Sequence, residues 1–410
     1  MNNLVAAFLI VLSSAGIVAG EPSSFQGLGA LETGSFASDV SSDGMTVVGN
    51  AQLAGITHAF RWSEKSGFVW LGTFPGGPFN SAALAASADG AVIVGLSEGR
   101  SSPMEAVVWP RKQKPVGLGF LWPSQSLAWG VSADGTVVVG RSGIQLENGL
   151  GTRAFIWSQA TGMIDLGTLP GGVMDSVAYD VSSDGSVVVG ISSSNAGSLA
   201  FMWTKEGGMV SLGDLPGGSH LSSAQAVSAD GTVIVGGGFS KLGLEAFRWT
   251  SRQGMAGLGA LDAPNPSSVA YDVSADGSVI VGASIARDLS STVAVIWDQA
   301  KGIQNLTDLL QGSGARLDDW ALESAIAVSA DGRTIVGNGR NPAGIHEAWI
   351  ARLGDGPSLI PADLNADGVV DGLDLGILLA QWGAAGAADL DATGIVDGLD
   401  LGILLAMWTL

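Results

Sequence analysis

The stretch Ser132-Ala133-Asp134-Gly135-Thr136-Val137-Val138-Val139-Gly140 decides the fold of the central part of this chain. Asp-Gly predicts a tight turn, because the turn needs a positive φ angle that glycine adopts at little cost. The valines that follow are bounded by Gly140 and are typical of a short buried strand. These nine residues therefore predict the turn and the second strand of a β-hairpin.

The same pattern occurs seven times along the chain. Ser-x-Asp-Gly recurs at intervals of 45 to 55 residues, each time before a β-branched run that ends in Gly. An Ala-Phe-x-Trp segment or a near variant follows, and then a Leu-Gly segment, which is degenerate at Leu306-Thr307. Each repeat predicts four short strands and no helix, as in a propeller blade. The aspartates of the seven turns are Asp43, Asp89, Asp134, Asp184, Asp230, Asp276 and Asp331.

The order of the segments predicts how the ring closes. The Leu28-Gly29 segment has no repeat before it, and the seventh repeat has no Leu-Gly segment after Trp349. We therefore expect residues 26–31 to complete the last repeat as its outer strand, which removes an unpaired sheet edge. The predicted fold class is all-β, with a seven-bladed β-propeller over residues 21–353.

Composition limits the classes of partner. The 410 residues include 38 acidic and 18 basic side chains, a formal net charge of −20, and no cysteine. This charge argues against nucleic acid and anionic membranes, because both attract basic proteins. It favours metal cations, neutral glycans or protein. The absence of cysteine excludes disulfides and thiolate metal sites.

The first 20 residues predict a signal peptide. Leu4 to Leu12 are apolar, and the small residues Val18-Ala19-Gly20 precede Glu21-Pro22. Such a run is too short to span a bilayer and is typical of a cleaved export signal. We expect an extracellular, secreted protein with no membrane span in the mature chain. The alternative is a short buried element at the terminus.

Few residues in the repeats suggest chemistry, and no catalytic residue is predicted. The seven repeated aspartates are interpreted as turn residues that hold the hairpins. Tryptophans outside the repeated position either stack on sugars in a central funnel or fill gaps between blades. Carboxylates in the longest insertion either serve a cation or glycan chemistry, or lie in a solvated loop. The tryptophans are Trp70, Trp122, Trp129 and Trp320, and the carboxylates are Asp318, Asp319 and Glu323.

The repeats resemble a known family. His58-Ala59-Phe60-Arg61-Trp62, followed by Leu-Gly-Thr-Phe-Pro-Gly-Gly at 71–77, is similar to the motif of the extracellular HAF-repeat proteins of bacteria. The resemblance covers about residues 24–353. It implies secretion and suggests a propeller, and it carries no catalytic residues to transfer.

The C-terminus contains a duplicated motif. DLNADGVVDGLDLGILLAQW (363–382) and DLDATGIVDGLDLGILLAMW (389–408) match at 16 of 20 positions. Each begins with the ligand spacing of an EF-hand loop, which supplies the oxygen atoms that Ca²⁺ prefers, and continues into an apolar helix. The predicted ligands are Asp363, Asn365, Asp367, Val369, Asp371 and Asp374 in the first loop, and Asp389, Asp391, Thr393, Ile395, Asp397 and Asp400 in the second.

This C-terminal module resembles a type I dockerin over residues 363–410, after a linker at 354–362. The resemblance implies a small α-helical dockerin with paired EF-hand-like calcium loops, two bound Ca²⁺ ions, and a cohesin-like protein as partner. Thr393 offers a hydroxyl where the first loop has a carboxylate, so the second site is expected to be weaker.

Together these features predict a secreted, non-enzymatic binding or scaffold propeller. It would be attached through the calcium-binding dockerin to a cohesin-like partner or to the cell surface. Two alternatives stay open. One is a polysaccharide-degrading enzyme, a glycoside hydrolase or lyase of a dockerin-bearing system. The other is a carbohydrate-binding propeller with a glycan as its ligand.

Overall fold

The structure is a computed structural model, and it divides into two compact units. One comprises Ser23–Leu353, and the other includes Gly354–Leu410. The predicted signal peptide and most of the predicted linker lie outside the described residues. Described are residues 23–406 and 408, except residues 30, 32–33, 76–79, 100–103, 112, 147–148, 174, 262–266, 286–291, 299–300, 355–361, 363, 365–369, 371, 385, 387 and 391–393.

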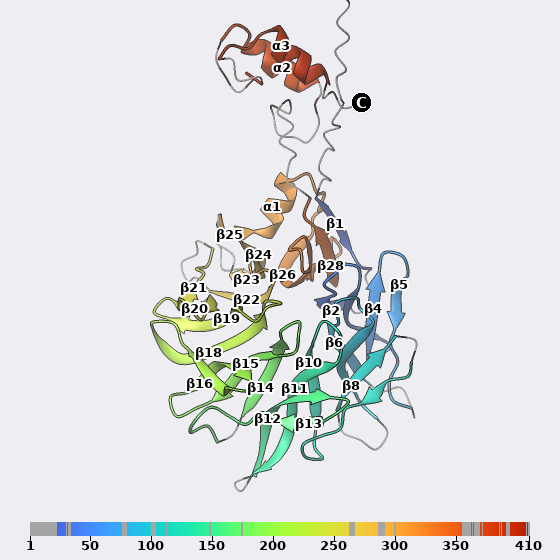
Figure 1. The fold of residues 1–410 in the computed structure, drawn as a ribbon. Coiled ribbons are helices and arrows are strands. Elements are labelled where there is room, and N and C mark those ends of the chain that lie inside the picture. Colours follow the sequence, from blue (N-terminus) through green and yellow to red (C-terminus); the bar gives the residue numbers. More distant parts are fainter. Residues whose placement is uncertain are drawn as a thin grey trace, which may run out of the picture. The chain divides into compact units, whose positions relative to one another are not determined.

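The strands of the first unit form four-stranded antiparallel groups, one for each sequence repeat (Figure 1). The first repeat contains β2 (Ser35–Val40), β3 (Val47–Leu53), β4 (Ile56–Ser63) and β5 (Gly67–Trp70). The second contains β6 (Ser81–Ala86), β7 (Val92–Ser97), β8 (Glu105–Pro110) and β9 (Val116–Gly117). The third contains β10 (Ser126–Val131), β11 (Val137–Leu146), β12 (Gly149–Ser158) and β13 (Gly162–Asp165).

The next three repeats follow the same order. The fourth contains β14 (Ser176–Val181), β15 (Val187–Ser193), β16 (Ser198–Thr204) and β17 (Gly208–Gly213). The fifth contains β18 (Gly217–Val227), β19 (Val233–Ser240), β20 (Gly243–Thr250) and β21 (Gly254–Gly257). The sixth contains β22 (Ser268–Val273), β23 (Val279–Ile285), β24 (Thr292–Asp298) and β25 (Gly302–Asn305). A single parallel pair, Ser198 with Leu221, joins the fourth and fifth groups into one sheet.

The last repeat takes its outer strand from the N-terminal end of the chain. β26 (Ala321–Val328), β27 (Thr334–Arg340) and β28 (His346–Arg352) are completed by β1 (Ser24–Gly27), which pairs antiparallel with β28. The predicted partner is therefore correct, but the predicted range 26–31 lies too late. The last residue of β1 is a glycine because a Cβ atom at Gly27 would collide with the Glu347 carboxylate and the Trp320 ring.

The Ser-x-Asp-Gly turns lie between the first two strands of each repeat, and each turn contacts the turn of a neighbouring repeat. The glycines of these turns have positive φ, for example 74° at Gly135, and a Cβ atom there would lie 2.6 Å from Val92 of the preceding repeat. Backbone N–H groups at the turns donate to carbonyls of the following turn at 3.0 to 3.3 Å. The donor and acceptor pairs are Asp43 to Ala88, Ala88 to Ala133, Ala133 to Ser183, Ser183 to Ala229, Ala229 to Ala275, Ala275 to Ala330, and Ala330 to Ser42. The cycle of bonds thus returns to the first repeat.

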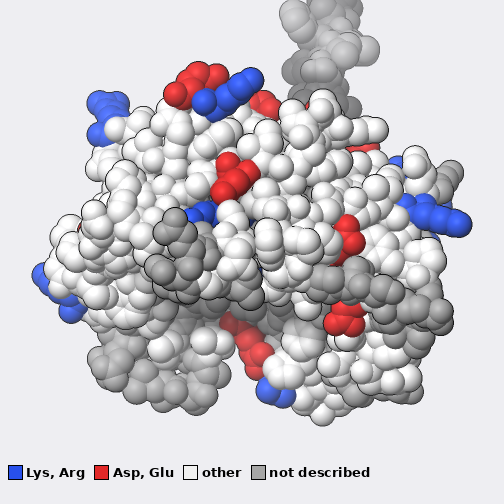
Figure 2. Space-filling view, turned by 90° about the horizontal axis from the view of Figure 1, so that it is seen from below, with Lys and Arg blue, Asp and Glu red and all other residues white. Residues whose placement is uncertain are grey.

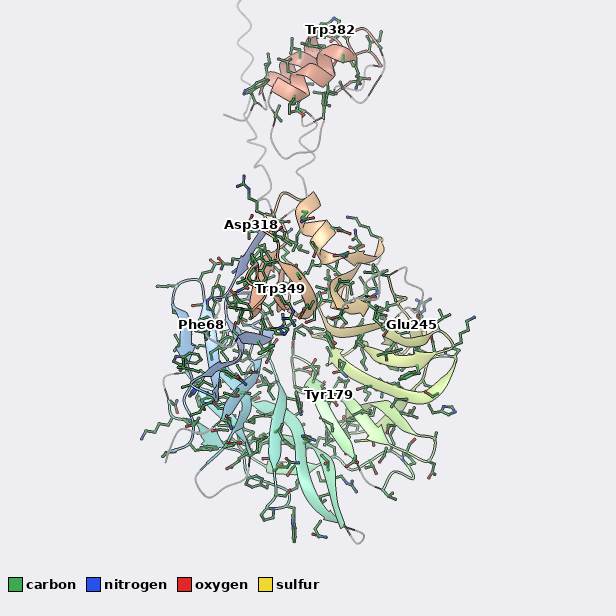
Figure 3. All side chains as sticks on the ribbon, turned by 180° about the vertical axis from the view of Figure 1, so that it is seen from behind. Phe68, Tyr179, Glu245, Asp318, Trp349 and Trp382 are labelled. Atoms are coloured by element: carbon green, nitrogen blue, oxygen red, sulfur yellow. The ribbon has the colours of Figure 1, made fainter. Side chains whose placement is uncertain are left out.

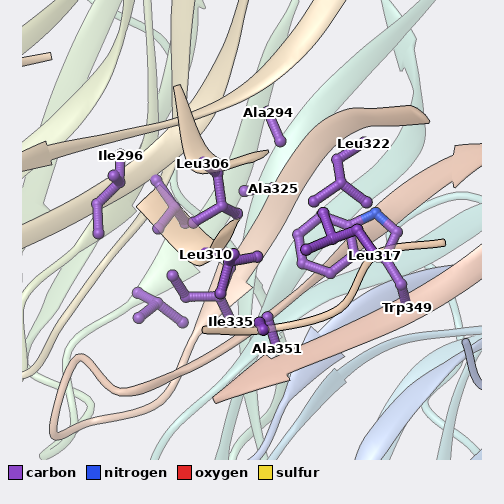
Figure 4. Packing of buried hydrophobic residues seen from close by; sticks show 13 residues of the cluster. Ala294, Ile296, Leu306, Leu310, Leu317, Leu322, Ala325, Ile335, Trp349 and Ala351 are labelled. Atoms are coloured by element: carbon purple, nitrogen blue, oxygen red, sulfur yellow. The ribbon is translucent and has the colours of Figure 1, made fainter. Parts of the chain in front are cut away.

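A helix replaces the degenerate Leu-Gly segment, so the expectation of no helix in the repeats is wrong there. α1 (Leu306–Gly312) begins at Asn305, whose side chain accepts the Thr307 N–H at 2.8 Å. Leu306 and Leu310 are fully buried, and they lie one turn apart on the helix. They pack in one hydrophobic cluster with Leu317 and Trp349 (Figure 4), so burial of one apolar face stabilises the helix.

The second unit contains two short helices, α2 (Gly372–Ala380) and α3 (Gly398–Ala406). Its core pairs the same positions of the two sequence copies, Val370 with Val396 and Leu378 with Leu404, and all four side chains are fully buried. Among the described residues, no helix is long and apolar enough to cross a membrane.

Candidate functional site

The repeated aspartates act as turn residues, as the sequence predicts. In all seven turns the Asp Oδ1 atom accepts the hydroxyl of the serine two residues earlier at 2.5 to 3.0 Å. It also accepts the backbone N–H two residues later at 2.9 to 3.0 Å. Both hydrogen bonds stabilise the turn, so these carboxylates have a structural role.

Three other aspartates lie around a cavity on the axis of the ring. Asp39, Asp180 and Asp272 occupy the same position on β2, β14 and β22, the innermost strands of three repeats. They line a cavity of about 120 Å³ together with the turn residues and the last residues of the seven innermost strands. Sequence reasoning missed them. The available signal was an Asp-Val pair before Ser-x-Asp-Gly, where the other repeats have Ala or Gly before the last strand residue.

Each axial carboxylate connects its repeat to the next. Asp39 Oδ2 accepts the Ala86 N–H at 2.8 Å, and its Oδ1 accepts the Val40 N–H at 2.7 Å. In the same way, Asp180 Oδ2 accepts the Val227 N–H at 2.9 Å, and Asp272 Oδ2 accepts the Val328 N–H at 2.8 Å. The three residues follow the register shift that interrupts each innermost strand, and this bulge turns the side chain toward the neighbouring repeat.

Burial raises the pKa of all three carboxyls, because the enclosed site disfavours charge. The pKa of Asp39 rises to about 7 and that of Asp180 to about 6. The pKa of Asp272 lies well above its ordinary value, because burial is reinforced by the negative charges of Asp39 and Asp180. The hydrogen bonds from backbone N–H groups act in the opposite direction and are outweighed. The cavity therefore holds carboxyl groups that take up protons near neutral pH.

The four candidate tryptophans lie in different environments. Trp70 ends β5 and Trp122 lies between β9 and β10, and both are exposed, at 40% and 44%. Trp129 is half-buried on the innermost strand β10, where its ring meets the Tyr179 ring edge to face at 5.8 Å. Trp320 packs against the core of the seventh repeat, with its ring 5.3 Å from Phe25. Figure 3 shows Tyr179 close to the centre of the ring and Glu245 farther out. The four rings therefore do not form one sugar-binding surface.

The carboxylates of the long insertion lie in two different local settings. Glu323 lies on β26, where it accepts the Arg340 Nε–H at 3.0 Å and lies 3.5 Å from the His346 imidazole. Asp318 and Asp319 have positive φ angles of 43° and 63° in the turn before Trp320. The structure thus gives Glu323 an ion-pairing role on the surface.

Five of the twelve predicted calcium ligands fall on described residues: Asp374, Asp389, Ile395, Asp397 and Asp400. The others, Asp363, Asn365, Asp367, Val369, Asp371, Asp391 and Thr393, lie outside the described residues. Among the residues that the structure describes, no group of three or more His or acidic side chains has metal-binding geometry.

The described part of the second loop is nevertheless organised. Asp389 Oδ2 accepts the Gly394 N–H at 2.7 Å, and Asp397 Oδ1 accepts the Leu399 N–H at 2.8 Å. Asp400 is fully buried, and its two oxygens accept the N–H groups of Leu390 at 2.6 Å and Asp397 at 2.7 Å.

The first loop repeats one of these contacts. Asp374 is fully buried, and its Oδ1 accepts the Leu364 N–H at 2.7 Å. Asp374 and Asp400 thus make the same contact with the second residue of their own loops. In both copies a buried carboxylate at the start of a helix fixes the start of its loop.

Comparison with known proteins shows the fold alone. No family model matches the chain, and no curated protein matches it. An oligogalacturonate lyase in complex with manganese is similar in structure, with 14% identity, 82% of this chain and 97% of that chain covered, and a TM-score of 0.51.

Two further structures have lower scores. TolB from Acinetobacter baumannii has 14% identity over 75% of this chain and 81% of that chain, with a TM-score of 0.42. The β-propeller domain of the Trilobed protease from Pyrococcus furiosus has 13% identity over 77% and 95%, with a TM-score of 0.48. The chain is all-β with few short helices, and its first unit has the β-propeller fold.

Proposed function

We propose that this protein is an extracellular binding propeller, attached to a partner by a calcium-dependent C-terminal module. The first unit would be one closed, seven-bladed ring. Two observations support this ring: the cycle of backbone hydrogen bonds through all seven turns, and the pairing of β1 with β28. A ring closed in this way leaves no wide gap between first and last blade.

The arrangement of Asp374 and Asp400 carries the proposal for the C-terminal module. Each is a fully buried carboxylate at the last ligand position of an EF-hand-like loop, and each accepts the N–H of the second loop residue. Two buried carboxylates are costly in a unit this small unless a cation or hydrogen bonds compensate their charge. The dockerin resemblance of the sequence gives the same interpretation.

The donor set fits calcium. The twelve predicted ligands offer carboxylate, amide, hydroxyl and backbone oxygens, and Ca²⁺ takes six to eight oxygen ligands. A bound Ca²⁺ would supply positive charge that offsets the carboxylates and fixes the loops. Asp389 already holds the Gly394 N–H, so this side chain is aligned with the turn of the second loop.

The attachment surface would lie on the exposed leucines at the start of the two helices. Leu373 and Leu399 occupy equivalent positions and are 65% and 66% exposed. Leu379 and Leu405 lie six residues later in the same helices, and each is 52% exposed. Large exposed apolar side chains in equivalent pairs favour a protein partner, since single molecules rarely expose them together. A cohesin-like protein fits this chemistry.

A binding role accounts for the propeller better than catalysis does. The axial carboxylates are held by N–H groups of the next repeat, in a cavity of about 120 Å³. Small-molecule sites typically have at least about 300 Å³, so this cavity does not fit a sugar substrate. The enzyme alternative would need an active site elsewhere on the ring.

Calorimetric titration of the full chain with Ca²⁺ tests the attachment module. We expect two ions per chain, with the second loop weaker because of Thr393. Asp374→Ala should remove the stronger site and Asp400→Ala the weaker one. Asp308→Ala, an exposed carboxylate in α1, serves as the control and should bind both ions. A titration without Ca²⁺-dependent heat, or one unaffected by both loop variants, would refute the calcium module.

A further inference from the structure

A groove between the first and second repeats combines positive charge with an aromatic surface. The cavity has a volume of about 330 Å³, within the range of small-molecule sites. Its walls come from β4 and β5 of one repeat and from β7, β8 and the following turn of the next. The residues that the argument uses are Arg61, Trp70, Trp109, Arg111 and Gln113.

The two arginines are available for a ligand. Among the described residues, no carboxylate lies in ion-pair distance of Arg61 or Arg111, whereas Arg340 and Arg352 are paired with Glu323 and Glu64. Asp89 is an acidic neighbour of Arg111, but its carboxylate is already held by Ser87 and by the Ala91 N–H. The groove therefore places two basic side chains together in a chain that has only 18 basic residues and a net charge of −20. Figure 2 shows how few charged groups lie on one face of the molecule.

Several residues of the groove differ between the repeats. Arg61 is the variable residue of Ala-Phe-x-Trp. The fifth repeat also has an arginine there, Arg248, and the other repeats have apolar residues: Val108, Ile156, Met202, Ile296 and Ile350. Trp70 pairs with Phe60, and the residues in the same pairing are Gly117 and Gly257 in the second and fifth repeats. Arg111 stands where the first repeat has Glu64. The combination of Arg61, Trp70 and Arg111 in one groove is therefore not required by the repeated fold.

The chemistry of the groove selects a carboxylated sugar. An arginine side chain binds a carboxylate through paired, charge-assisted hydrogen bonds. The Trp70 indole is 40% exposed and offers an apolar surface of the kind that packs against sugar C–H groups. Trp109 is 97% buried at the base, where its Nε1–H donates to the Gly72 carbonyl at 3.1 Å, so the base is fixed.

We propose that this groove binds a uronic acid residue of an acidic polysaccharide, with Arg61 and Arg111 on the carboxylate and Trp70 against the ring. Gln113 would bind hydroxyl groups at the edge of the groove. The proposal deepens the binding function proposed above by naming the ligand class. An experiment can refute one proposal without the other, because the groove lies within Ser23–Leu353 and the calcium loops lie after Gly354.

Fluorescence titration of the full chain with trigalacturonate tests the proposal, with its methyl ester as the uncharged counterpart. We expect trigalacturonate to bind at least tenfold more tightly than the ester. Arg61→Gln and Arg111→Gln should each weaken binding about tenfold, as expected for the loss of charge-assisted hydrogen bonds. Arg252→Gln, an exposed arginine between β20 and β21, is the matched control and should change affinity less than twofold.

Binding should be the same in calcium and in chelator, which separates this site from the calcium module. The comparison of acid with ester needs no variant, so the test holds even where an arginine variant fails to fold. Equal affinity for acid and ester, or an equal loss in Arg252→Gln, would overturn the proposal. Tighter binding of hexaglutamate than of trigalacturonate would also overturn it and identify an acidic peptide as the ligand.

Discussion

Three single residues, the axial aspartates, are expected to make the stability of the ring depend on pH. Asp39, Asp180 and Asp272 use their carboxylates to join neighbouring repeats, but they converge on one enclosed cavity. Two opposing effects meet there. The N–H donors favour the charged form, while burial and mutual repulsion favour the protonated form and are stronger.

We predict that the propeller loses stability as pH rises from about 4 to 7. The pKa of Asp39 rises from 3.8 to about 7, so the folded state binds more protons than the unfolded chain in this window. The stabilisation is complete below pH 4 and is lost as pH passes through the folded pKa. For Asp39 the difference is roughly 4 kcal/mol, at about 1.4 kcal/mol per pH unit.

Thermal unfolding between pH 4 and 8 measures this effect. Asp39→Asn and Asp180→Asn should each flatten the decline of Tm with pH, because an amide does not titrate. Asp308→Asn changes an exposed carboxylate outside the cavity and should leave the slope unchanged. A slope that persists in a variant with Asn at all three positions, Asp39, Asp180 and Asp272, would contradict the role of the axial carboxyls.

Glycine at the repeated turns is a second prediction at the residue scale. Gly135→Ala should destabilise the fold more than Gly119→Ala. Both residues have positive φ, 74° and 81°, so both substitutions strain the backbone by about 1 to 2 kcal/mol. Only the Cβ atom at position 135 would meet a neighbouring repeat, 2.6 Å from Val92, while the one at 119 would enter open space. Overpacking adds about 1 to 3 kcal/mol. Chemical denaturation measures the difference, and equal losses would show that contact between repeats contributes nothing.

At the scale of elements, buried serines on the innermost strands hold the repeats together. Their Oγ atoms accept the backbone N–H of the alanine in the Ala-Phe-x-Trp segment of the preceding repeat, at 2.9 to 3.2 Å. Each such serine satisfies a backbone group that the sheet leaves unpaired at a buried position. The acceptors are Ser35, Ser81, Ser126, Ser176, Ser222 and Ser268.

The N-terminal strand β1 gives a prediction for an element. A chain that starts at residue 28 should unfold at a lower temperature than one that starts at residue 21. The deletion removes the antiparallel pairing with β28 and the packing of Phe25 on Trp320 and Trp349. The expected loss is about 4 kcal/mol or more, from one buried aromatic side chain and several hydrogen bonds. Equal unfolding temperatures would mean that β1 does not stabilise the ring.

The sequence predicts which segments form strands and turns. It predicts less well where a strand ends and which distant residues it contacts. The turns and Val-rich strands follow from local chemistry, so Asp134-Gly135 and its six counterparts lie where expected. The bounds of β1 follow from its pairing with β28, and Glu347 and Trp320, which leave no room for a side chain at Gly27, lie about 300 residues away in the chain. α1 depends on burial of Leu306 and Leu310 against the seventh repeat, which no local pattern indicates.

The candidate sites follow the same rule. The predicted calcium ligands are close in sequence, so a spacing pattern can predict them without a structure. The axial carboxylates and the Arg61–Arg111 groove come from different repeats, and only the folded ring brings them together. In the sequence, these sites appear only as departures from the repeat at scattered positions, such as Asp39 and Trp70.

At the scale of the whole molecule, the two compact units should respond to calcium differently. The second unit has a small core and two helices of nine residues each, too short to be stable alone in water. Removing calcium leaves its loop carboxylates to repel one another, so metal binding should contribute much of its folding free energy. The propeller contains none of the predicted calcium ligands.

Differential scanning calorimetry of the full chain, in calcium and in chelator, tests this account most directly. We predict two transitions in calcium: a large one from the propeller and a small one from the C-terminal module. Chelator should abolish the small transition and leave the large one within a degree or two. A small transition that survives chelation, or a large one that shifts with it, would contradict a calcium-dependent module beside an independent propeller.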